Sequence, residues 1–316
     1  MMTWTISARS HSTMNTLAFH AVVAGISAAI LSGCAATPAS SVHSLTGEEI
    51  PAVVSKPLGT GPFPAVVVLH DCAGAGPHGS GMGDRWTREL VQQGYVVIQP
   101  DSFSSRGFEH GVCHIPVKDR KDLRDRTTRV KDALGALAYL RTLPYVDGRH
   151  IGVMGGSHGG SATLGVIAAQ DKLVGAGQGF TAGIALYPGC EGGWGQGVGV
   201  KRTPRKGPGP HVYSHAGPFN PGAPLLILAG EQDDWTPAGF CRELTEASKN
   251  ASFPIRLKVY PEAHHSFDSP RPIAYRRQRV NPYAEDGWGA TTGGNAEARA
   301  NAEIQVRDFF AATLRP

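Results

Sequence analysis

The sequence predicts an α/β protein with a mostly parallel central sheet and helices on both faces. Short apolar runs alternate along the chain with segments whose apolar residues recur at helical spacing, a pattern typical of parallel sheets. One apolar run leads into a G-x-S-x-G turn, and two later runs end in Asp and His. The 316 residues suffice for one large domain or two small ones, and 41% hydrophobic with 18% charged residues fits a globular protein.

Residues 1–33 predict an export signal that is not part of the fold. Arg9 is the only full charge before an apolar run at 17–31, which leads into Leu-Ser-Gly-Cys ending at Cys34. The run is too short and too weakly apolar to span a bilayer permanently. Leu-Ser-Gly-Cys is also typical of a bacterial lipobox, in which the cysteine is lipidated and becomes the first mature residue.

A lipidated Cys34 predicts a protein anchored in the bacterial cell envelope. Ala35 favours the periplasmic face of the outer membrane. The alternative is an ordinary signal peptide cleaved near Ala35 or Ala36, which leaves a periplasmic protein. Residues 34–46, rich in small and polar side chains, are expected to form a flexible tether ahead of a catalytic domain at 47–316.

The elements of that domain follow from apolar runs and periodicity. Unbroken apolar runs predict buried parallel strands, and apolar residues at helical spacing, stopped by Pro144, predict a helix over 119–142. The expected order is a strand at 64–70, a helix at 84–93, a strand at 95–100, the helix at 119–142, a strand into Ser157, strands at 181–187, 225–229 and 255–260, and a closing helix at 296–314.

Two segments, 191–224 and 269–295, do not fit the alternation. Both are long and lie just after strand ends, where binding residues usually lie. We expect partly ordered loops at the rim of an active site, with disordered insertions as the alternative. Their basic clusters are expected to be solvated loops: Lys201, Arg202, Arg205 and Lys206, then Arg271, Arg276, Arg277 and Arg279.

The G-x-S-x-G turn places Ser157 at a sharp bend between strand and helix, where a hydroxyl projects from the sheet edge. The next backbone N–H, that of His158, would point where an oxyanion forms. The motif alone is weak in a chain with 41 glycines. The order Ser157, Asp233, His265 adds weight, because each residue follows a predicted strand in the order of α/β-hydrolase triads.

Two assignments are choices between neighbours. Asp233 is preferred over Asp234 because it stands three residues after Gly230. His265 is preferred over His264 because the pattern Tyr-Pro-x-Ala-x-His-x-Phe places it two residues before a phenylalanine. The sequence therefore predicts a serine nucleophile, a histidine general base and a carboxylate that orients the base.

Over nearly all of residues 50–315 the chain resembles the dienelactone hydrolase family of α/β-hydrolases. The motifs that carry the resemblance are Val67-Val68-Leu69-His70-Asp71-Cys72, Gln99-Pro100-Asp101-Ser102-Phe103, Gly155-Gly156-Ser157-His158-Gly159, Ala185-Leu186-Tyr187-Pro188-Gly189, Gly230-Glu231-Gln232-Asp233, and Tyr260-Pro261-x-Ala263-x-His265-Ser266-Phe267. The resemblance implies the α/β-hydrolase fold, cleavage of carboxylic esters or lactones through an acyl-enzyme, no cofactor, and a second oxyanion donor at the backbone N–H of Cys72.

The chain departs from the family pattern at three points. The namesake enzymes use a cysteine nucleophile activated by a glutamate, where this chain has Ser157 and Asp71. They also hold a substrate carboxylate with two arginines. Arg106 lies near the first of those positions, and Ser269 stands at the second. Asp71, Arg106 and Trp235 are the candidate substrate-binding residues.

The four cysteines after Cys34 are an even number in an oxidising compartment, and none has C-x-x-C spacing. Each follows a different strand, and in the α/β-hydrolase order the first two strands are adjacent, as are the last two. Adjacent strands lie about 4.8 Å apart, which predicts disulfides Cys72–Cys113 and Cys190–Cys241. Buried reduced cysteines are the alternative. His110 and His114 are expected to be loop histidines, and no metal site is predicted.

A net charge of +4, spread along the chain, gives no sign of nucleic-acid binding. The expected partners are a small ester or lactone and, through the lipid, a membrane. Two other functions stay open: a peptidase or amidase on the same fold, and a non-catalytic envelope lipoprotein. The non-catalytic function would require a triad in which a catalytic residue has been lost, whereas this triad has all three residue types.

Overall fold

A computed structural model describes residues 35–36, 40–120, 123–191, 201–203, 212–214 and 219–315. The expected signal peptide, Cys34 and most of the segment 191–224 lie outside the described residues. Among the described residues no helix has the length and hydropathy needed to cross a bilayer.

The expected parallel sheet is present, and the fold is confirmed as α/β. Its strand order is β1-β3-β5-β4-β6-β7-β10-β11, with β2 beside β3. The strands are β1 Ala35–Ala36, β2 Ser40–His43, β3 Glu49–Lys56, β4 Phe63–Leu69, β5 Val96–Pro100, β6 Val146–Gly156, β7 Ala182–Leu186, β10 Leu225–Gly230 and β11 Ile255–Tyr260. From β5 to β11 every pair is parallel, and β1, β2 and β3 pair antiparallel.

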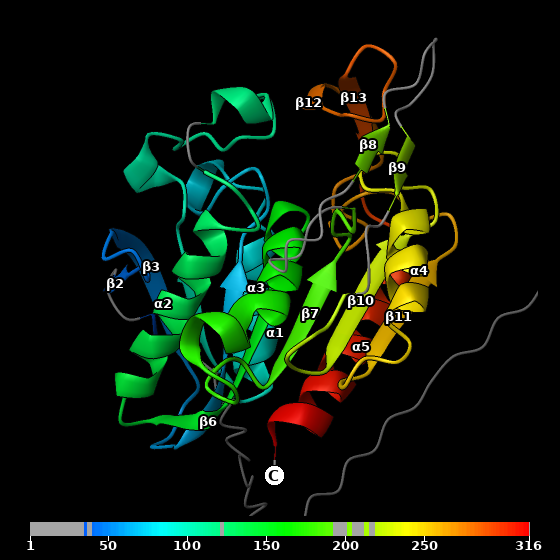
Figure 1. Ribbon diagram of the computed structural model, residues 1–316. Helices are drawn as coiled ribbons and strands as arrows, with labels where there is room; N and C mark the ends of the chain where they lie inside the picture. The colour runs from blue at the N-terminus through cyan, green and yellow to red at the C-terminus, as the bar shows by residue number, and fades with distance from the viewer. Residues whose placement is uncertain are drawn as a thin grey trace, which may run out of the picture. The chain divides into compact units, whose positions relative to one another are not determined.

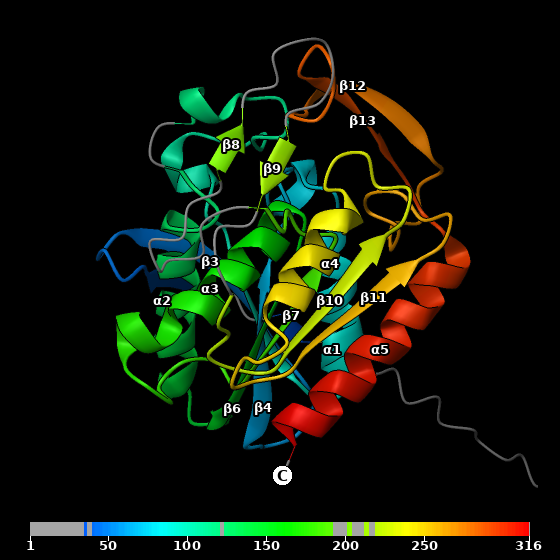
Figure 2. The same ribbon diagram turned by 45° about the vertical axis from the view of Figure 1, so that its right-hand side comes forward.

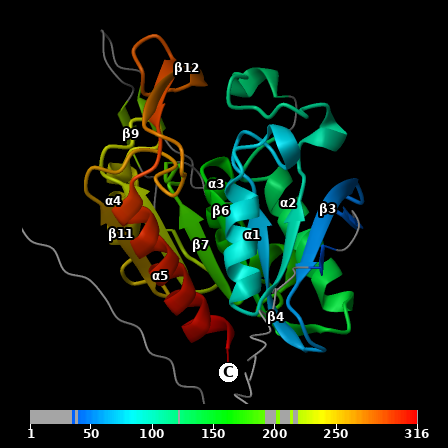
Figure 3. The ribbon, with the colours of Figure 1, turned by 180° about the vertical axis from the view of Figure 1, so that it is seen from behind.

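Helices cover both faces of the sheet (Figure 1). One face carries α2 Thr128–Thr142, α3 His158–Val174 and α4 Ala238–Ala247, and the other carries α1 Met82–Gln92 and α5 Ala296–Leu314, which lie in front of the sheet in Figure 3. Successive residues of β4 alternate between the two cores: Val67 packs with the α2, α3 and α4 side, and Val68 with the α1 and α5 side. The unbroken apolar run that predicted this strand therefore reflects burial on both faces.

Two expected boundaries were wrong. The helix expected from residue 119 begins at Thr128, because Leu123 is drawn into a side cluster with Cys72, Phe103 and Cys113 instead of the helix's core face. The tether expected over 34–46 is also too long. Val42 of β2 is buried in the core beside α2, and β2 pairs with β3 along its whole length. Residues 40–46 therefore belong to the domain.

The segment expected to be a rim loop at 269–295 contains an antiparallel hairpin, β12 Ala274–Val280 and β13 Trp288–Thr292. In Figure 2 it rises beyond the ends of β10 and β11. The backbone N–H of Gly293 donates to His265 O at 3.0 Å, and that of Val280 donates to Cys113 O at 3.0 Å. The hairpin is therefore fixed to loops at the carboxyl ends of the strands, where ligands bind in α/β sheets.

A second small ladder, β8 Lys201–Thr203 with β9 Val212–Ser214, is described only by its backbone.

Candidate active site

Ser157 stands between β6 and α3 in a backbone conformation that side-chain-bearing residues rarely adopt, with φ 54° and ψ −117°. Its own N–H donates to Leu186 O at 2.9 Å. The turn is closely packed: a Cβ on Gly159 would lie 2.2 Å from the carbonyl oxygen of Leu69. Glycine is therefore required beside the serine, and the strained bend directs the hydroxyl out of the sheet edge.

The three residues expected to form a triad lie in hydrogen-bonding contact. His265 Nε2 is 2.8 Å from Ser157 Oγ, and His265 Nδ1 is 2.8 Å from Asp233 Oδ2. All three side chains are buried. Asp233 Oδ1 accepts the backbone N–H groups of Trp235 and Thr236 at 2.9 and 2.8 Å. These bonds direct the other carboxylate oxygen at the imidazole.

The neighbouring residues that the sequence left as alternatives lie elsewhere. Asp234 accepts the backbone N–H and the hydroxyl of Thr291, each at 2.8 Å, and so binds the β12–β13 hairpin. His264 Nδ1 lies 3.0 Å from Gln232 O. The geometry therefore selects Asp233 and His265.

The two residues whose backbone amides were expected to bind an oxyanion lie near the nucleophile. His158 is the first residue of α3. Its N–H therefore lies at the amino-terminal end of the helix, which favours negative charge. Cys72 lines the same cavity as Ser157. Neither amide donates a hydrogen bond to any residue that the structure describes. Both amides therefore lack an acceptor in the described part of the chain.

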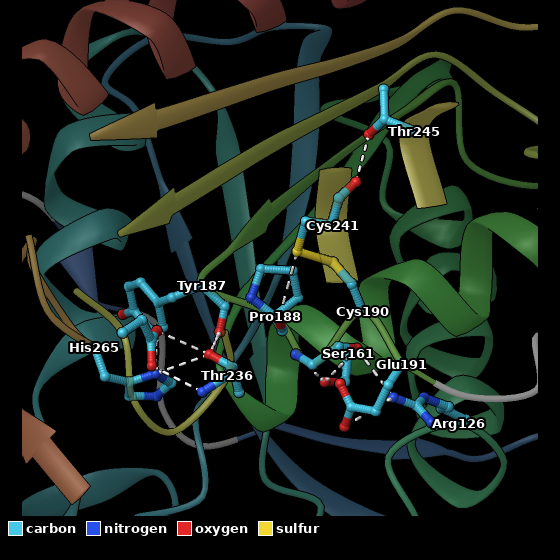
Figure 4. The surroundings of a disulfide bond; sticks show 12 residues. Arg126, Ser161, Tyr187, Pro188, Cys190, Glu191, Thr236, Cys241, Thr245 and His265 are labelled. Carbon is cyan, nitrogen blue, oxygen red and sulfur yellow. Dashed lines mark hydrogen bonds and ion pairs between the residues drawn. A yellow bond between two sulfur atoms is a disulfide. The ribbon is translucent and has the colours of Figure 1, made fainter. Parts of the chain in front are cut away.

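Thr236 and Tyr187 complete the surroundings of the imidazole and were not predicted from the sequence (Figure 4). Thr236 Oγ1 lies 2.9 Å from Asp233 Oδ2 and 3.1 Å from His265 Nδ1. The Tyr187 ring meets the His265 ring edge-on, 4.8 Å between centroids, and its hydroxyl donates to Asp268 Oδ1 at 2.9 Å. Burial, followed by the charge of Asp268, raises the pKa of Tyr187 well above its ordinary value. A threonine three residues after an aspartate is a turn signal that could have indicated Thr236.

Both expected disulfides are present. The Cα atoms of Cys72 and Cys113 are 4.9 Å apart, and those of Cys190 and Cys241 are 5.0 Å apart. Figure 4 shows the second bond joining the segment after β7 to α4. The first bond ties the candidate oxyanion donor to the loop before α2.

A cavity of about 360 Å³ opens over Ser157 and His265. Asp71 and Trp235, two of the three candidate substrate-binding residues, line it. Asp71 Oδ1 also accepts the N–H of Ala73 at 2.8 Å, and Trp235 Nε1 donates to Val280 O at 2.8 Å.

Three arginines from the segment after the histidine line the same cavity. Arg271, Arg276 and Arg279 have no carboxylate within ion-pairing distance among the described residues. The guanidinium carbon of Arg279 lies 5.6 Å from the ring centroid of Trp235, and its buried Nε has no described partner. Asp71 is the only acidic residue among the described lining. Arg271 and Arg276 are solvent-exposed, as expected, whereas Arg279 is partly buried, and the hairpin that folds back over the strand ends places all three beside the cavity.

Arg106, the third candidate substrate-binding residue, does not reach this cavity. Its Nη1 donates to Asp132 Oδ2 at 2.8 Å and its Nη2 to Glu48 Oε2 at 2.6 Å. It lines a separate cavity of about 860 Å³. The two carboxylates pair with the guanidinium away from Ser157, so the expected role was wrong.

The loop histidines form no metal site in the described part of the chain, where no three His, Cys, Asp or Glu side chains come together in a way that could hold an ion. The ring of His110 meets that of His78, with centroids 4.9 Å apart. His114 lines the cavity over Ser157.

Residues 50–314 match the sequence profile of the dienelactone hydrolase family. A curated relative, the putative carboxymethylenebutenolidase of Yersinia pestis, is 27% identical over 254 residues, which cover 77% of this chain and 81% of the relative. The protein of the same description from Methylorubrum extorquens is 26% identical over 252 residues, 76% of this chain and 74% of the relative.

Solved structures share the fold. A putative dienelactone hydrolase from Klebsiella pneumoniae has a TM-score of 0.60 at 21% identity, covering 88% of this chain and 99% of that one. Dipeptidyl peptidase 4 of Porphyromonas gingivalis has a TM-score of 0.55 at 22% identity, covering 87% of this chain but 35% of that one. Both levels of identity show the fold alone.

Proposed function

The chain belongs to the dienelactone hydrolase family, and we propose that it is a serine hydrolase that cleaves carboxylic esters or lactones through an acyl-enzyme on Ser157. The observation that carries the proposal is the unbroken series of contacts from Asp233 through His265 to Ser157, beside two backbone amides without acceptors. Such a series lets an otherwise weak hydroxyl act as a nucleophile at neutral pH.

In the proposed reaction, Ser157 Oγ attacks the ester carbonyl while His265 Nε2 accepts its proton. The tetrahedral oxyanion is stabilised by the N–H groups of Cys72 and His158. The histidine then gives its proton to the leaving alkoxide, which departs as the alcohol. Water attacks the acyl-enzyme by the same route. Asp233 holds the Nδ1–H tautomer and stabilises the imidazolium.

We further propose that the substrate carries an anionic group away from the scissile bond. The support is the charge of the cavity, in which Arg271, Arg276 and Arg279 lack carboxylate partners among the described residues while Asp71 is the one acid on the wall. Arg279, the one of the three that is partly buried, would be stabilised by a bidentate anion. Because these arginines are supplied by the segment after the histidine, Arg106 is not needed for this recognition.

A peptidase or amidase on the same fold is the second candidate, favoured by the fold shared with dipeptidyl peptidase 4. That likeness covers only 35% of the peptidase. A cavity of about 360 Å³ matches the lower part of the range for small-molecule sites. We therefore prefer an ester or lactone.

We also propose that the domain is exported and lipid-anchored at Cys34. Two disulfides support an oxidising compartment.

The test of the reaction class compares short 4-nitrophenyl esters with the matching 4-nitroanilides. We expect ester hydrolysis, labelling of Ser157 by a fluorophosphonate, and a loss of several orders of magnitude in kcat for Ser157→Ala at nearly unchanged Tm. Gln170→Met, which alters a buried side chain bonded to Phe180 and Gly222, controls for loss of packing. Ester turnover retained by Ser157→Ala excludes the acyl-enzyme, and preferred cleavage of anilides favours the peptidase.

A further inference from the structure

We propose that Arg129 is a positioning residue for the oxyanion site: from behind the nucleophile turn it fixes the side chain of His158, whose backbone amide is one of the two oxyanion donors. This inference rests on the proposed function. Arg129 belongs to α2 and His158 begins α3, two helices that lie side by side on one face of the sheet (Figure 1).

Arg129 is a fully buried cation with few hydrogen bonds. Its side chain is 0% exposed, and its Nη1 lies 3.0 Å from His158 Nδ1. Its Nε and Nη2 have no hydrogen-bond partner among the described residues. Burying a guanidinium with donors unused destabilises the fold. A packed apolar side chain would avoid that cost.

The contact fixes the protonation state of the histidine ring. A guanidinium only donates, so His158 Nδ1 accepts and its proton lies on Nε2. Burial lowers the pKa of His158 to about 3, so the ring stays neutral at neutral pH. Burial also lowers the pKa of Arg129, to about 10, which leaves the guanidinium charged. A permanent donor therefore holds the ring of the residue that supplies the oxyanion amide.

Phe103 extends this support to the second oxyanion donor. Its ring lies 5.1 Å from the guanidinium carbon of Arg129 and meets the ring of His70 edge-on at 4.4 Å. His70 Nδ1 donates to the carbonyl oxygen of Asp71 at 2.8 Å, directly before Cys72. One group of packed side chains thus supports both amides; we call it the oxyanion support cluster, consisting of His70, Phe103, Arg129 and His158.

Nearby carboxylates partly offset the charge of Arg129, although none of the described ones lies within ion-pairing distance of it. The acidic groups that act on it are Asp132, Asp125, Asp71 and Asp101. Asp132 pairs directly with Arg106. Arg129 is therefore not a free charge aimed at the substrate. Its effect is exerted through the imidazole that it holds, and it is absent from the lining of the cavity.

The test separates binding from the chemical step. Arg129→Met keeps an unbranched side chain and removes the donor to His158. We expect kcat for a neutral 4-nitrophenyl ester to fall by about 10- to 100-fold, less than the loss of an oxyanion donor, with KM within about twofold. A trifluoromethyl ketone, which forms an oxyanion on Ser157, should lose affinity in proportion to kcat/KM. Arg129→Lys should recover part of the loss.

Two further variants make the test specific. His158→Leu removes the acceptor from the other side of the contact, and the double variant should lose no more than either single one if the pair acts as a unit. Gln170→Met is the matched control on α3: its buried side chain bonds Phe180 and Gly222, so it should lower Tm without lowering kcat. If Arg129→Met does not fold, His158→Leu and its effect on ketone affinity carry the test.

The outcomes divide as follows. Wild-type kcat in Arg129→Met, an equal loss of kcat in Gln170→Met at a matched loss of Tm, or full additivity in the double variant overturns the role of Arg129 and leaves the proposed function standing. A wild-type protein that neither hydrolyses esters nor binds the ketone at Ser157 overturns the proposed function and this inference with it.

Discussion

Asp234, the residue next to the triad carboxylate, accepts both the backbone N–H and the hydroxyl of Thr291 at 2.8 Å. Thr291 belongs to β13, and its partner strand β12 carries Arg276 and Arg279. Adjacent aspartates therefore contact two parts of the site: Asp233 bonds the His265 ring, and Asp234 holds the hairpin that bears the arginines.

This division predicts opposite kinetic effects for the two aspartates. Asp233→Asn should lower kcat by about 10⁴-fold through the wrong imidazole tautomer. Asp234→Asn should leave kcat within a few-fold and raise KM for an anionic ester by about fivefold, because the hairpin loses a bond to a charged acceptor. Steady-state kinetics of both variants check this. A larger loss of kcat in Asp234→Asn would reverse the assignment.

The arginines of the hairpin predict a preference for charged substrates. Replacing both Arg276 and Arg279 with glutamine should raise KM for 4-nitrophenyl hemisuccinate by about tenfold or more and leave KM for the neutral butyrate ester within twofold. Added salt should weaken the preference of the wild type. Arg277→Gln is the matched control, since Arg277 is on the same strand and does not line the cavity. Equal effects on both esters would make the arginines structural.

The two disulfides should differ in what they contribute to activity. They close chain segments of 41 and 51 residues, so each is expected to stabilise the fold by about 4 kcal/mol in the chain-entropy estimate. Only Cys72 supplies a candidate oxyanion amide. Replacing Cys72 and Cys113 with alanine should lower both Tm and kcat, whereas replacing Cys190 and Cys241 should lower Tm alone. The kcat values of the two variants are compared at a temperature well below both values of Tm. Equal kcat in the two variants would contradict the prediction.

Buried histidines predict that stability falls in mild acid. Burial lowers the pKa of His70 and His158 well below their ordinary value of about 6.5. Below pH 6.5 the unfolded chain binds protons that the folded chain does not, so the stability present above this pH is lost as pH falls. Each histidine contributes a slope of about 1.4 kcal/mol per pH unit there. Urea unfolding at pH 7, 6 and 5 measures it, and His70→Gln should reduce the slope. A flat profile would contradict buried neutral histidines.

The sequence predicted the parts of the site that depend on strand ends. Ser157 and Asp233 each follow a buried strand, and His265 follows the edge strand β11. The carboxyl ends of parallel strands bring such residues together. The disulfide pairs followed from the same adjacency.

The remaining residues depend on contacts between segments distant along the chain. Arg106 was misassigned because its partners Glu48 and Asp132 come from distant segments of the chain. In the sequence, nothing distinguishes Arg129 from the other polar residues of α2. Only the packing of α3 beside α2 brings Arg129 to His158. The positive charge of the cavity depends on the hairpin, which folds back over the strand ends and brings Arg276 and Arg279 to the cavity wall.

The last prediction concerns the membrane. The backbone of Ala35 and Ala36 pairs with Lys56 and Ser55 at the edge of the sheet, so a lipid on Cys34 would attach directly beside the domain. Two or more acyl chains, at about 0.8 kcal/mol per buried methylene, hold a protein stably without a transmembrane helix. Cys34→Ala should block lipidation and leave the protein unprocessed or in the soluble periplasmic fraction, with unchanged ester hydrolysis once released. Fractionation and mass analysis of the mature amino terminus check this. A soluble wild-type protein that begins beyond Cys34 would contradict the lipid anchor and support only the export signal.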